Sequence, residues 1–163
     1  MLDNFNVSTQ VSSDNTIALS LLLDFYQTIP MPPHLTRLPD RRLSEERRNF
    51  KPISRRISLR TYDQAPHWII AVFSRQFPDD IFRVSVATDS IGCGCSTYTI
   101  RNGTISGKEE LPDYSREAYE LAFQHFPLCR YRYVYSAATG TYREREPAEL
   151  DRIERMLHEL GLI

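Results

Sequence analysis

The first apolar pattern in the chain predicts a helix. Apolar side chains between residues 16 and 27 recur at the spacing of one helix face, at Ile17, Leu21, Leu22, Phe25 and Tyr26. The polar residues 12–15 just before them are good N-caps. Because Pro30 has no amide hydrogen and disfavours helical geometry in the residue before it, we expect the helix to end by Ile29.

Residues 30–60 are predicted to be an irregular arm. Four of its first ten residues are prolines, and pairs of arginines follow them. A short helical turn is expected at residues 45–50. Near the end of the arm, Ile57 and Leu59 alternate with polar neighbours, as they do in a half-buried strand.

The sharpest pattern begins at Ala65 and predicts a helix followed by a strand. Pro66 suits a first helical turn, and apolar residues then follow a period close to 3.6 until Pro78. Residues 81–88 switch to a period of two, which points Phe82, Val84 and Val86 to one face. This predicts a strand with one buried side.

Residues typical of turns separate the predicted elements in the rest of the chain. Gly92 and Gly94 predict a tight connection to a strand over residues 96–101, and Asn102-Gly103 is a strong signal for a hairpin. Ser115 begins a predicted helix that Pro127 closes, and residues 128–136 have the pattern of another strand. A final helix is expected from Pro147, with one apolar stripe at Leu150, Ile153, Leu157 and Leu160.

This order of elements predicts an α+β protein with two layers, in which helices pack on one face of a mainly antiparallel sheet. A ferredoxin-like topology is the leading interpretation. The predicted parts are an N-terminal helical segment at residues 1–29, a proline- and arginine-rich arm at 30–60 and an α+β core at 61–163. We expect them to form one structural unit, since 163 residues are about one domain.

Composition points to a globular protein of the cytoplasm. Hydrophobic residues make up 41% of the chain and charged residues 25%, which is ordinary for a globular fold. Residues 1–10 have no basic start, and the apolar stretch at 17–23 is too short to span a bilayer, so no membrane contact is expected. Three cysteines, an odd number, fit a reducing compartment.

The net charge of the chain is −1, but its charged residues are distributed unevenly. Residues 37–60 hold nine basic and three acidic residues, a net charge of +6, whereas the rest of the chain carries −7. Arginine pairs on such an arm suit carboxylates of a protein partner or phosphates of a nucleic acid, and they also suit internal pairing with the acidic body. The predicted partner-binding residues of the arm are Arg41, Arg42, Arg47, Arg48, Arg55 and Arg56.

The predicted strand over residues 128–136 adds two further candidates for partner binding, Tyr131 and Tyr133. With Tyr135 they share one face by the period of two. An exposed tyrosine face would resemble the stacking platforms of RNA-binding domains. The other interpretation, which the sequence favours, is that the C-terminal helix covers this face.

The cysteines and histidines of the sequence do not predict a metal site or a catalytic site. Cys93 and Cys95 lie in a Gly-Cys-Gly-Cys turn, but zinc needs four ligands and no second pair has ligand spacing. Nothing in the sequence aligns Cys93 with His125 and Asp89 as a catalytic group, and we expect His67 and His125 at helix surfaces. We therefore assign no catalytic residue, no metal and no cofactor.

Several phrases of the sequence together resemble the YubB-type ferredoxin-like domain family, small proteins of bacteriophages and conjugative plasmids. The phrases are Ala65-Pro66, Phe77-Pro78-Asp79, the run from Asp89 to Tyr98 and Asn102-Gly103. The resemblance covers about residues 65–126 and rests on structural turns rather than on catalytic groups. It implies an accessory protein of a mobile element.

The function expected from these observations is binding, and inhibition, of a bacterial host macromolecule such as a defence or nucleic-acid-processing protein. The alternative is a nucleic-acid-binding module that uses the basic arm. A third interpretation is a small enzyme that depends on Cys93 or Cys95.

Overall fold

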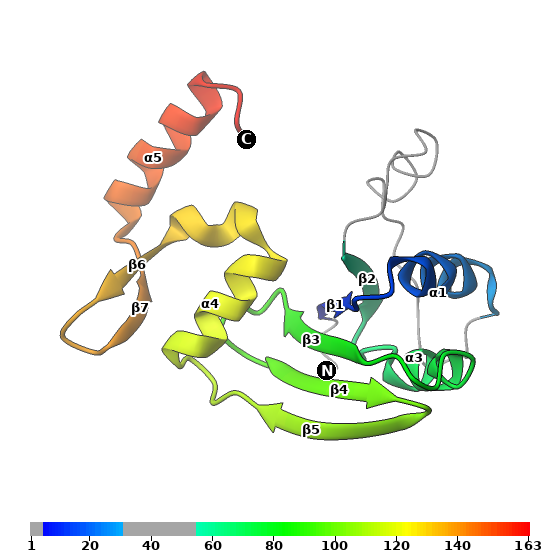
Figure 1. Cartoon of the computed structure of the whole chain (residues 1–163). Coiled ribbons are helices and arrows are strands. Elements are labelled where there is room, and N and C mark those ends of the chain that lie inside the picture. The colour runs from blue at the N-terminus through cyan, green and yellow to red at the C-terminus, as the bar shows by residue number, and fades with distance from the viewer. Residues whose placement is uncertain (1–4, 31–54) are drawn as a thin grey trace.

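The computed structural model describes residues 5–30 and 55–163, in which helices pack around an antiparallel sheet (Figure 1). The elements are β1 (Asn6–Ser12), α1 (Thr16–Thr28), β2 (Arg56–Tyr62), α3 (His67–Ser74), β3 (Phe82–Thr88), β4 (Ser96–Arg101), β5 (Thr104–Glu110), α4 (Arg116–His125), the 3-10 helix η1 (Pro127–Arg132), β6 (Tyr133–Ser136), β7 (Thr141–Glu144) and α5 (Pro147–Glu159). The predicted α+β class is confirmed. The predicted turn at residues 45–50 lies outside the described residues.

The main sheet of the described residues has five strands in the order β2-β1-β3-β4-β5, and every neighbouring pair is antiparallel. This arrangement is consistent with a ferredoxin-like fold. β1, which the sequence analysis missed, pairs along its length with both β2 and β3. The segment at 1–29 is therefore not only helical, and the sheet extends well beyond the predicted core at 61–163.

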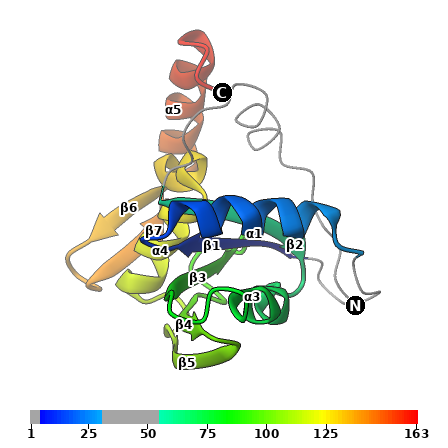
Figure 2. The ribbon, with the colours of Figure 1, turned by 45° about the vertical axis from the view of Figure 1, so that its right-hand side comes forward.

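The hydrophobic core lies between one face of this sheet and the helices α1 and α3 (Figure 2). Leu19 and Leu22 of α1 and Ile70 of α3 are fully buried against it. Asn15 caps α1, because its Oδ1 accepts a hydrogen bond from the Ala18 amide at 3.0 Å. Strand residues in the core have a period of two: Val7, Val11, Leu59, Phe82, Val84 and Ile100.

α4 lies against the opposite face, so the expectation that all helices share one face is wrong. Ala118 and Ala122 of α4 pack on Ala87 of β3 and on Cys95, and all four are buried. These side chains are small and apolar, which lets the helix approach the sheet closely at this end. The sheet is consequently covered on both sides here.

The local turn predictions are largely confirmed. Asn102 and Gly103 have φ values of +46° and +79°, the left-handed pair that a two-residue hairpin needs. Ser115 caps α4 by accepting from the Ala118 amide at 3.2 Å. The strand expected over 128–136 is wrong in its first half, because Pro127 begins η1 and the strand β6 starts only at Tyr133.

α5 begins at Pro147 as predicted, but it stands away from the main sheet (Figures 1 and 2). None of its residues is fully buried, and Met156 and Leu160 are 52% and 65% exposed. The prediction that this helix covers a face of three tyrosines on one strand is wrong, because Tyr131 lies in η1 and not on β6; Tyr131 itself contacts α5 through a hydrogen bond to Glu154. No helix of the described residues has both the length and the hydropathy needed to cross a membrane.

Candidate binding face of the sheet

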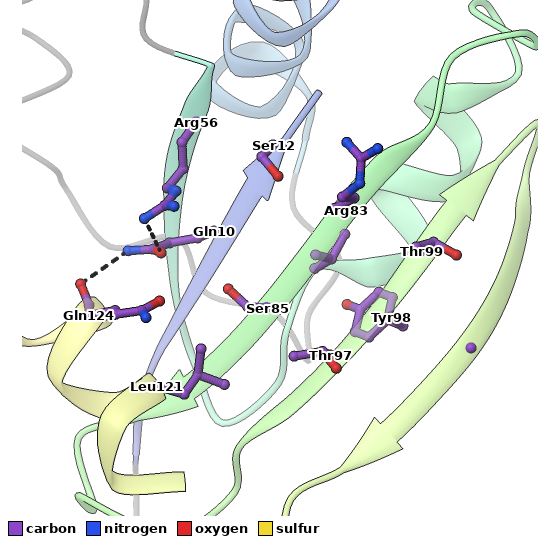
Figure 3. A pocket seen from close by; sticks show the side chains of 12 residues that line it. Gln10, Ser12, Arg56, Arg83, Ser85, Thr97, Tyr98, Thr99, Leu121 and Gln124 are labelled. Carbon is purple, nitrogen blue, oxygen red and sulfur yellow. Dashed lines mark hydrogen bonds between the residues drawn. The ribbon is translucent and has the colours of Figure 1, made fainter. Parts of the chain in front are cut away.

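A hollow of about 320 Å³, with polar and apolar lining residues, opens on the sheet face that carries α4, beside that helix (Figure 3). It exists because α4 covers only one end of this face, while polar residues with a period of two occupy the strands. The hollow is lined by Gln10, Ser12, Arg56, Arg83, Val84, Ser85, Thr97, Tyr98, Thr99, Gly107, Leu121 and Gln124. None of these residues is acidic.

Strand register aligns two arginines across this hollow. Ser12 of β1 is the pairing partner of Arg56 on β2 and also of Arg83 on β3. Directly paired residues of an antiparallel sheet point to the same face. Arg56, Ser12 and Arg83 thus form one row over three neighbouring strands, which we call the arginine row.

The two arginines differ in their surroundings. Arg56 Nη1 donates to Gln10 Oε1 at 3.5 Å, and Gln10 Nε2 donates to the carbonyl oxygen of Gln124 at 3.4 Å. Arg83 is exposed, and its side chain makes no hydrogen bond or ion pair with any residue that the structure describes. The row therefore places two arginines side by side on this face, and none of the described residues that line the hollow carries a carboxylate.

A second polar row lies next to the first. Gln10 pairs with Ser58 on one side and Ser85 on the other, and Ser85 pairs with Thr97. Glu109 of β5 pairs with Thr97 at the far end of this row. Hydroxyl and amide groups thus extend the hollow away from the two arginines.

His125 at the end of α4 is buried, and the prediction that it lies at a helix surface is wrong. Its Nδ1 and Nε2 lie 2.9 Å from the hydroxyl oxygens of Ser8 and Ser85. A neutral imidazole has one donor and one acceptor nitrogen, and a hydroxyl can fill either complementary role. Through these two hydrogen bonds, His125 connects the end of α4 to β1 and β3 at the edge of the hollow.

The surroundings of His125 favour its neutral form. Burial removes water from the charged form, and the positive charges of Arg56 and Arg60 add to this effect, which together lower the pKa of His125 to about 4. Its contact with Ser85 has the spacing of a nucleophile and a base. However, the other ring nitrogen meets the Ser8 hydroxyl and not the carboxylate that orients histidine in a catalytic triad.

The structure does not bring Cys93, His125 and Asp89 together. Both ring nitrogens of His125 meet serine hydroxyls, and Asp89 Oδ1 accepts from the amide of Asn6 at 3.2 Å. Cys95 is 2% exposed, and its thiol donates to the carbonyl oxygen of Ala118 at 3.4 Å. In residues 5–30 and 55–163, no three metal-ligating side chains gather in one place.

We expect Cys95 to be alkylated very slowly in the folded protein. Burial, followed by the nearby Cys93 and Asp113, raises its pKa from 9.0 to about 11, which lowers the thiolate fraction by about 100-fold. Timed treatment with iodoacetamide and peptide mass spectrometry would measure this rate, with half-exposed Cys129 as the internal control. Equal rates for Cys95 in folded and urea-unfolded protein would show that the thiol is not protected.

The arginines predicted from the arm are only partly placed. Arg41, Arg42, Arg47 and Arg48 lie outside the described residues. Arg55 is exposed just before β2, and its carbonyl oxygen accepts from the amide of Ser13 at 3.3 Å. Of the two predicted arginines that the structure describes, Arg56 lines the hollow and Arg55 does not.

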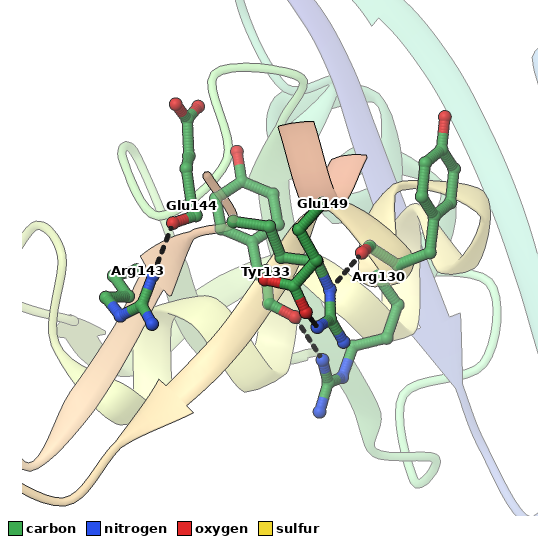
Figure 4. A network of polar contacts seen from close by, with 7 residues as sticks. Arg130, Tyr133, Arg143, Glu144 and Glu149 are labelled. Carbon is green, nitrogen blue, oxygen red and sulfur yellow. Dashed lines mark hydrogen bonds and ion pairs between the residues drawn. The ribbon is translucent and has the colours of Figure 1, made fainter. Parts of the chain in front are cut away.

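The two predicted tyrosines do not form an exposed face. Tyr131 lies in η1 and its hydroxyl donates to Glu154 Oε1 at 3.3 Å. Tyr133 is buried, with its ring 5.5 Å from that of Tyr119, and its carbonyl oxygen accepts from Arg130 Nη1 at 3.1 Å (Figure 4). Tyr133 thus holds the β6–β7 hairpin against α4.

Sequence reasoning missed Arg83, Ser12 and the hollow itself. The alternation of Ser8, Gln10 and Ser12 with Val7, the β-branched Thr9 and Val11 was the available signal for a half-buried strand at the N-terminus. Even with that strand assigned, its pairing partners depend on the folded sheet.

The chemistry of the hollow favours an anionic group. It combines two arginines with hydroxyl and amide groups, and the one aromatic ring among its lining residues, Tyr98, is 6% exposed. It therefore offers charge and hydrogen bonds without an exposed ring for base stacking.

No family model, curated protein or solved structure matches this chain.

Proposed function

We propose that this chain is a cytoplasmic accessory protein of a bacteriophage or plasmid that binds a host protein and inhibits it. Binding, rather than catalysis, is the proposed activity. The observation that carries the proposal is the arginine row, which places two arginines side by side on an open sheet face. The origin from a mobile element rests on the resemblance to the YubB-type family.

An acidic surface on the host protein is the contact that this face fits best. Arginine has a planar fork of donors that pairs with two carboxylate oxygens at once, and it is enriched at protein interfaces. Arg56 and Arg83 stand on strands that are paired on β1, so their backbones are held in place before the partner arrives. Preorganised groups lose less entropy on binding.

A host protein that handles nucleic acid or defends the cell is the proposed class of target. The sheet face that carries the hollow would cover part of the target's surface, and this would inhibit the target. Nucleic acid itself is the alternative ligand, and the arginines of the arm favour it. The absence of an exposed ring among the lining residues of the hollow speaks against single-stranded nucleic acid.

We expect affinity capture from a bacterial lysate to recover a stoichiometric protein that survives nuclease treatment. The double variant Arg56→Ala/Arg83→Ala should recover at least about tenfold less of it, because charge-assisted hydrogen bonds are lost. Mass spectrometry of the captured fraction would identify the protein and quantify the loss.

The matched control is Arg152→Ala/Arg155→Ala, which removes the same charge from exposed positions on α5. Equal capture by this control and the wild type is expected. Equal capture by the hollow variant as well would refute the role of the arginine row. Recovery of nucleic acid alone would contradict the host-protein proposal and favour the alternative, in which the ligand is nucleic acid.

A further inference from the structure

We propose that α5 is the contact surface of a homodimer, in which it packs antiparallel against α5 of a second copy of this chain. This inference goes beyond the proposed function, since none of the described residues that line the hollow belongs to α5. It gives a reason why a helix with an apolar stripe stands away from the main sheet (Figures 1 and 2).

The apolar stripe of α5 is largely open to solvent. Ile153, Met156 and Leu160 recur at intervals of three and four residues, which places them on one face of the helix. Ile153 is half-buried, whereas Met156 and Leu160 are 52% and 65% exposed. Neither hydrophobic cluster of the described residues includes a residue of α5. A continuous apolar face of this kind is typical of a contact with another molecule.

A contact on another side of α5 fixes the orientation of the helix. The hydroxyl of Tyr131 donates to Glu154 Oε1 at 3.3 Å. A helix turns by about 100° per residue, so Glu154 points roughly 120° or more away from Met156 and Leu160. The contact with Tyr131 therefore leaves the stripe open. A helix that is already held in place also loses less conformational freedom when a partner binds.

The charges beside the stripe fit a second copy of the same helix. A twofold axis between two antiparallel helices brings each flank of the stripe against the same flank of its partner, with the order of residues reversed. Arg152 and Glu159 share one flank, because seven residues make about two turns. With the axis near Met156, Arg152 lies beside Glu159 of the second copy, and the same pair forms again on the other side of the axis. Ile153 then packs on Met156 of the second copy.

Both members of this pair are available. Arg152 and Glu159 are exposed, and their side chains make no hydrogen bond or ion pair with any residue that the structure describes. A parallel pair of helices would instead bring Arg152 beside Leu157 of the second copy, which cannot neutralise it. The charges therefore favour the antiparallel arrangement.

A membrane surface fits α5 less well than a second copy does. Helices that lie on anionic membranes have a polar face rich in lysine and arginine. The polar face of α5 carries Asp151 and Glu159 as well as Arg152 and Arg155, so acids and bases are balanced. A balanced face of this kind suits a partner that carries the same mixture.

The size of the surface predicts a weak dimer. α5 has 13 residues and is about 20 Å long. Stable dimers bury roughly 800 Å² on each partner, and one face of a helix of this length supplies less. We therefore expect a dissociation constant of about 10–100 μM.

The test is sedimentation equilibrium of the full-length protein at concentrations from about 1 μM to about 500 μM, a range that brackets this constant. The average mass should rise from that of one chain towards that of two along a single monomer–dimer curve. A mass that stays at one chain over the whole range would overturn the proposal. A mass that rises past two chains would overturn it as well, because a twofold contact closes at the dimer.

The variant Met156→Glu/Leu160→Glu assigns the contact to the stripe. We expect dimerisation to weaken at least about 100-fold, because carboxylates would be buried in an apolar contact. The matched control is Ile17→Glu/Leu21→Glu, which changes two exposed apolar residues of α1, 71% and 45% exposed. The control should dimerise as the wild type does. Equal weakening of both variants would mean that exposed apolar groups associate non-specifically, and would overturn the role of α5.

A charge exchange tests the antiparallel pairing, and it cannot be explained by misfolding. Glu159→Arg should weaken dimerisation about three- to tenfold, since it brings arginine beside arginine in two places. Adding Arg152→Glu to the same chain should restore the wild-type dissociation constant, because both pairs are then opposite in charge again. Failure of the second change to restore dimerisation would overturn the antiparallel arrangement.

Discussion

Acidification from pH 7 to pH 4 should cost this protein about 3 kcal/mol of unfolding free energy through His125 alone. The pKa of this histidine falls from 6.5 to about 4 in the folded state, so the unfolded chain binds the proton more readily. The stabilisation is complete above pH 6.5 and is lost as the pH falls from 6.5 through 4. Urea unfolding at a series of pH values would measure it.

The variant His125→Gln separates this effect from the titration of carboxylates. Glutamine keeps a donor and an acceptor for Ser8 and Ser85 but has no proton to gain in this range. The stability difference between wild type and variant should therefore shrink by about 3 kcal/mol between pH 7 and pH 4. A constant difference across that range would mean that His125 is not held neutral by its burial.

Truncation of Leu22 to alanine should destabilise the protein by about 2–5 kcal/mol. Leu22 is 0% exposed and belongs to the core between α1 and the sheet, so the loss combines apolar burial with a cavity. The result tests whether the N-terminal segment is an integral part of the fold. Chemical denaturation followed by circular dichroism would give the free energy.

Leu128→Ala provides the matched control, because the same atoms are removed from a side chain that is 74% exposed. We expect this variant to change the unfolding free energy by less than about 0.5 kcal/mol. A small loss for Leu22→Ala, similar to that of the control, would show that α1 is not packed on the sheet as described.

Predictions that rested on short-range signals were the successful ones. The helix expected over 16–27 is α1, with Asn15 as its cap, and the Asn102-Gly103 hairpin has the backbone angles that its residues favour. Such features depend on neighbours within a few residues. Capping and turn chemistry are therefore readable before the fold is known.

Predictions that needed the partners of a strand or helix were the ones that failed. The tyrosines at 131 and 133 have the period of a strand, yet Pro127 starts a 3-10 turn that places Tyr131 outside it. The stripe on α5 has the spacing of a buried helix face, but none of its residues is fully buried. Periodicity shows that a face is apolar and does not show what covers it.

The α+β class, most helix ends and the hairpin turn could be predicted from the residues alone, because these depend on local backbone preferences and on the period of apolar residues. The position of β1 between β2 and β3 is a property of the folded sheet. That placement pairs Ser12 with both Arg56 and Arg83, residues far apart along the chain. Strand pairing is non-local, since the register comes from hydrogen bonds and core packing that exist only in the folded sheet.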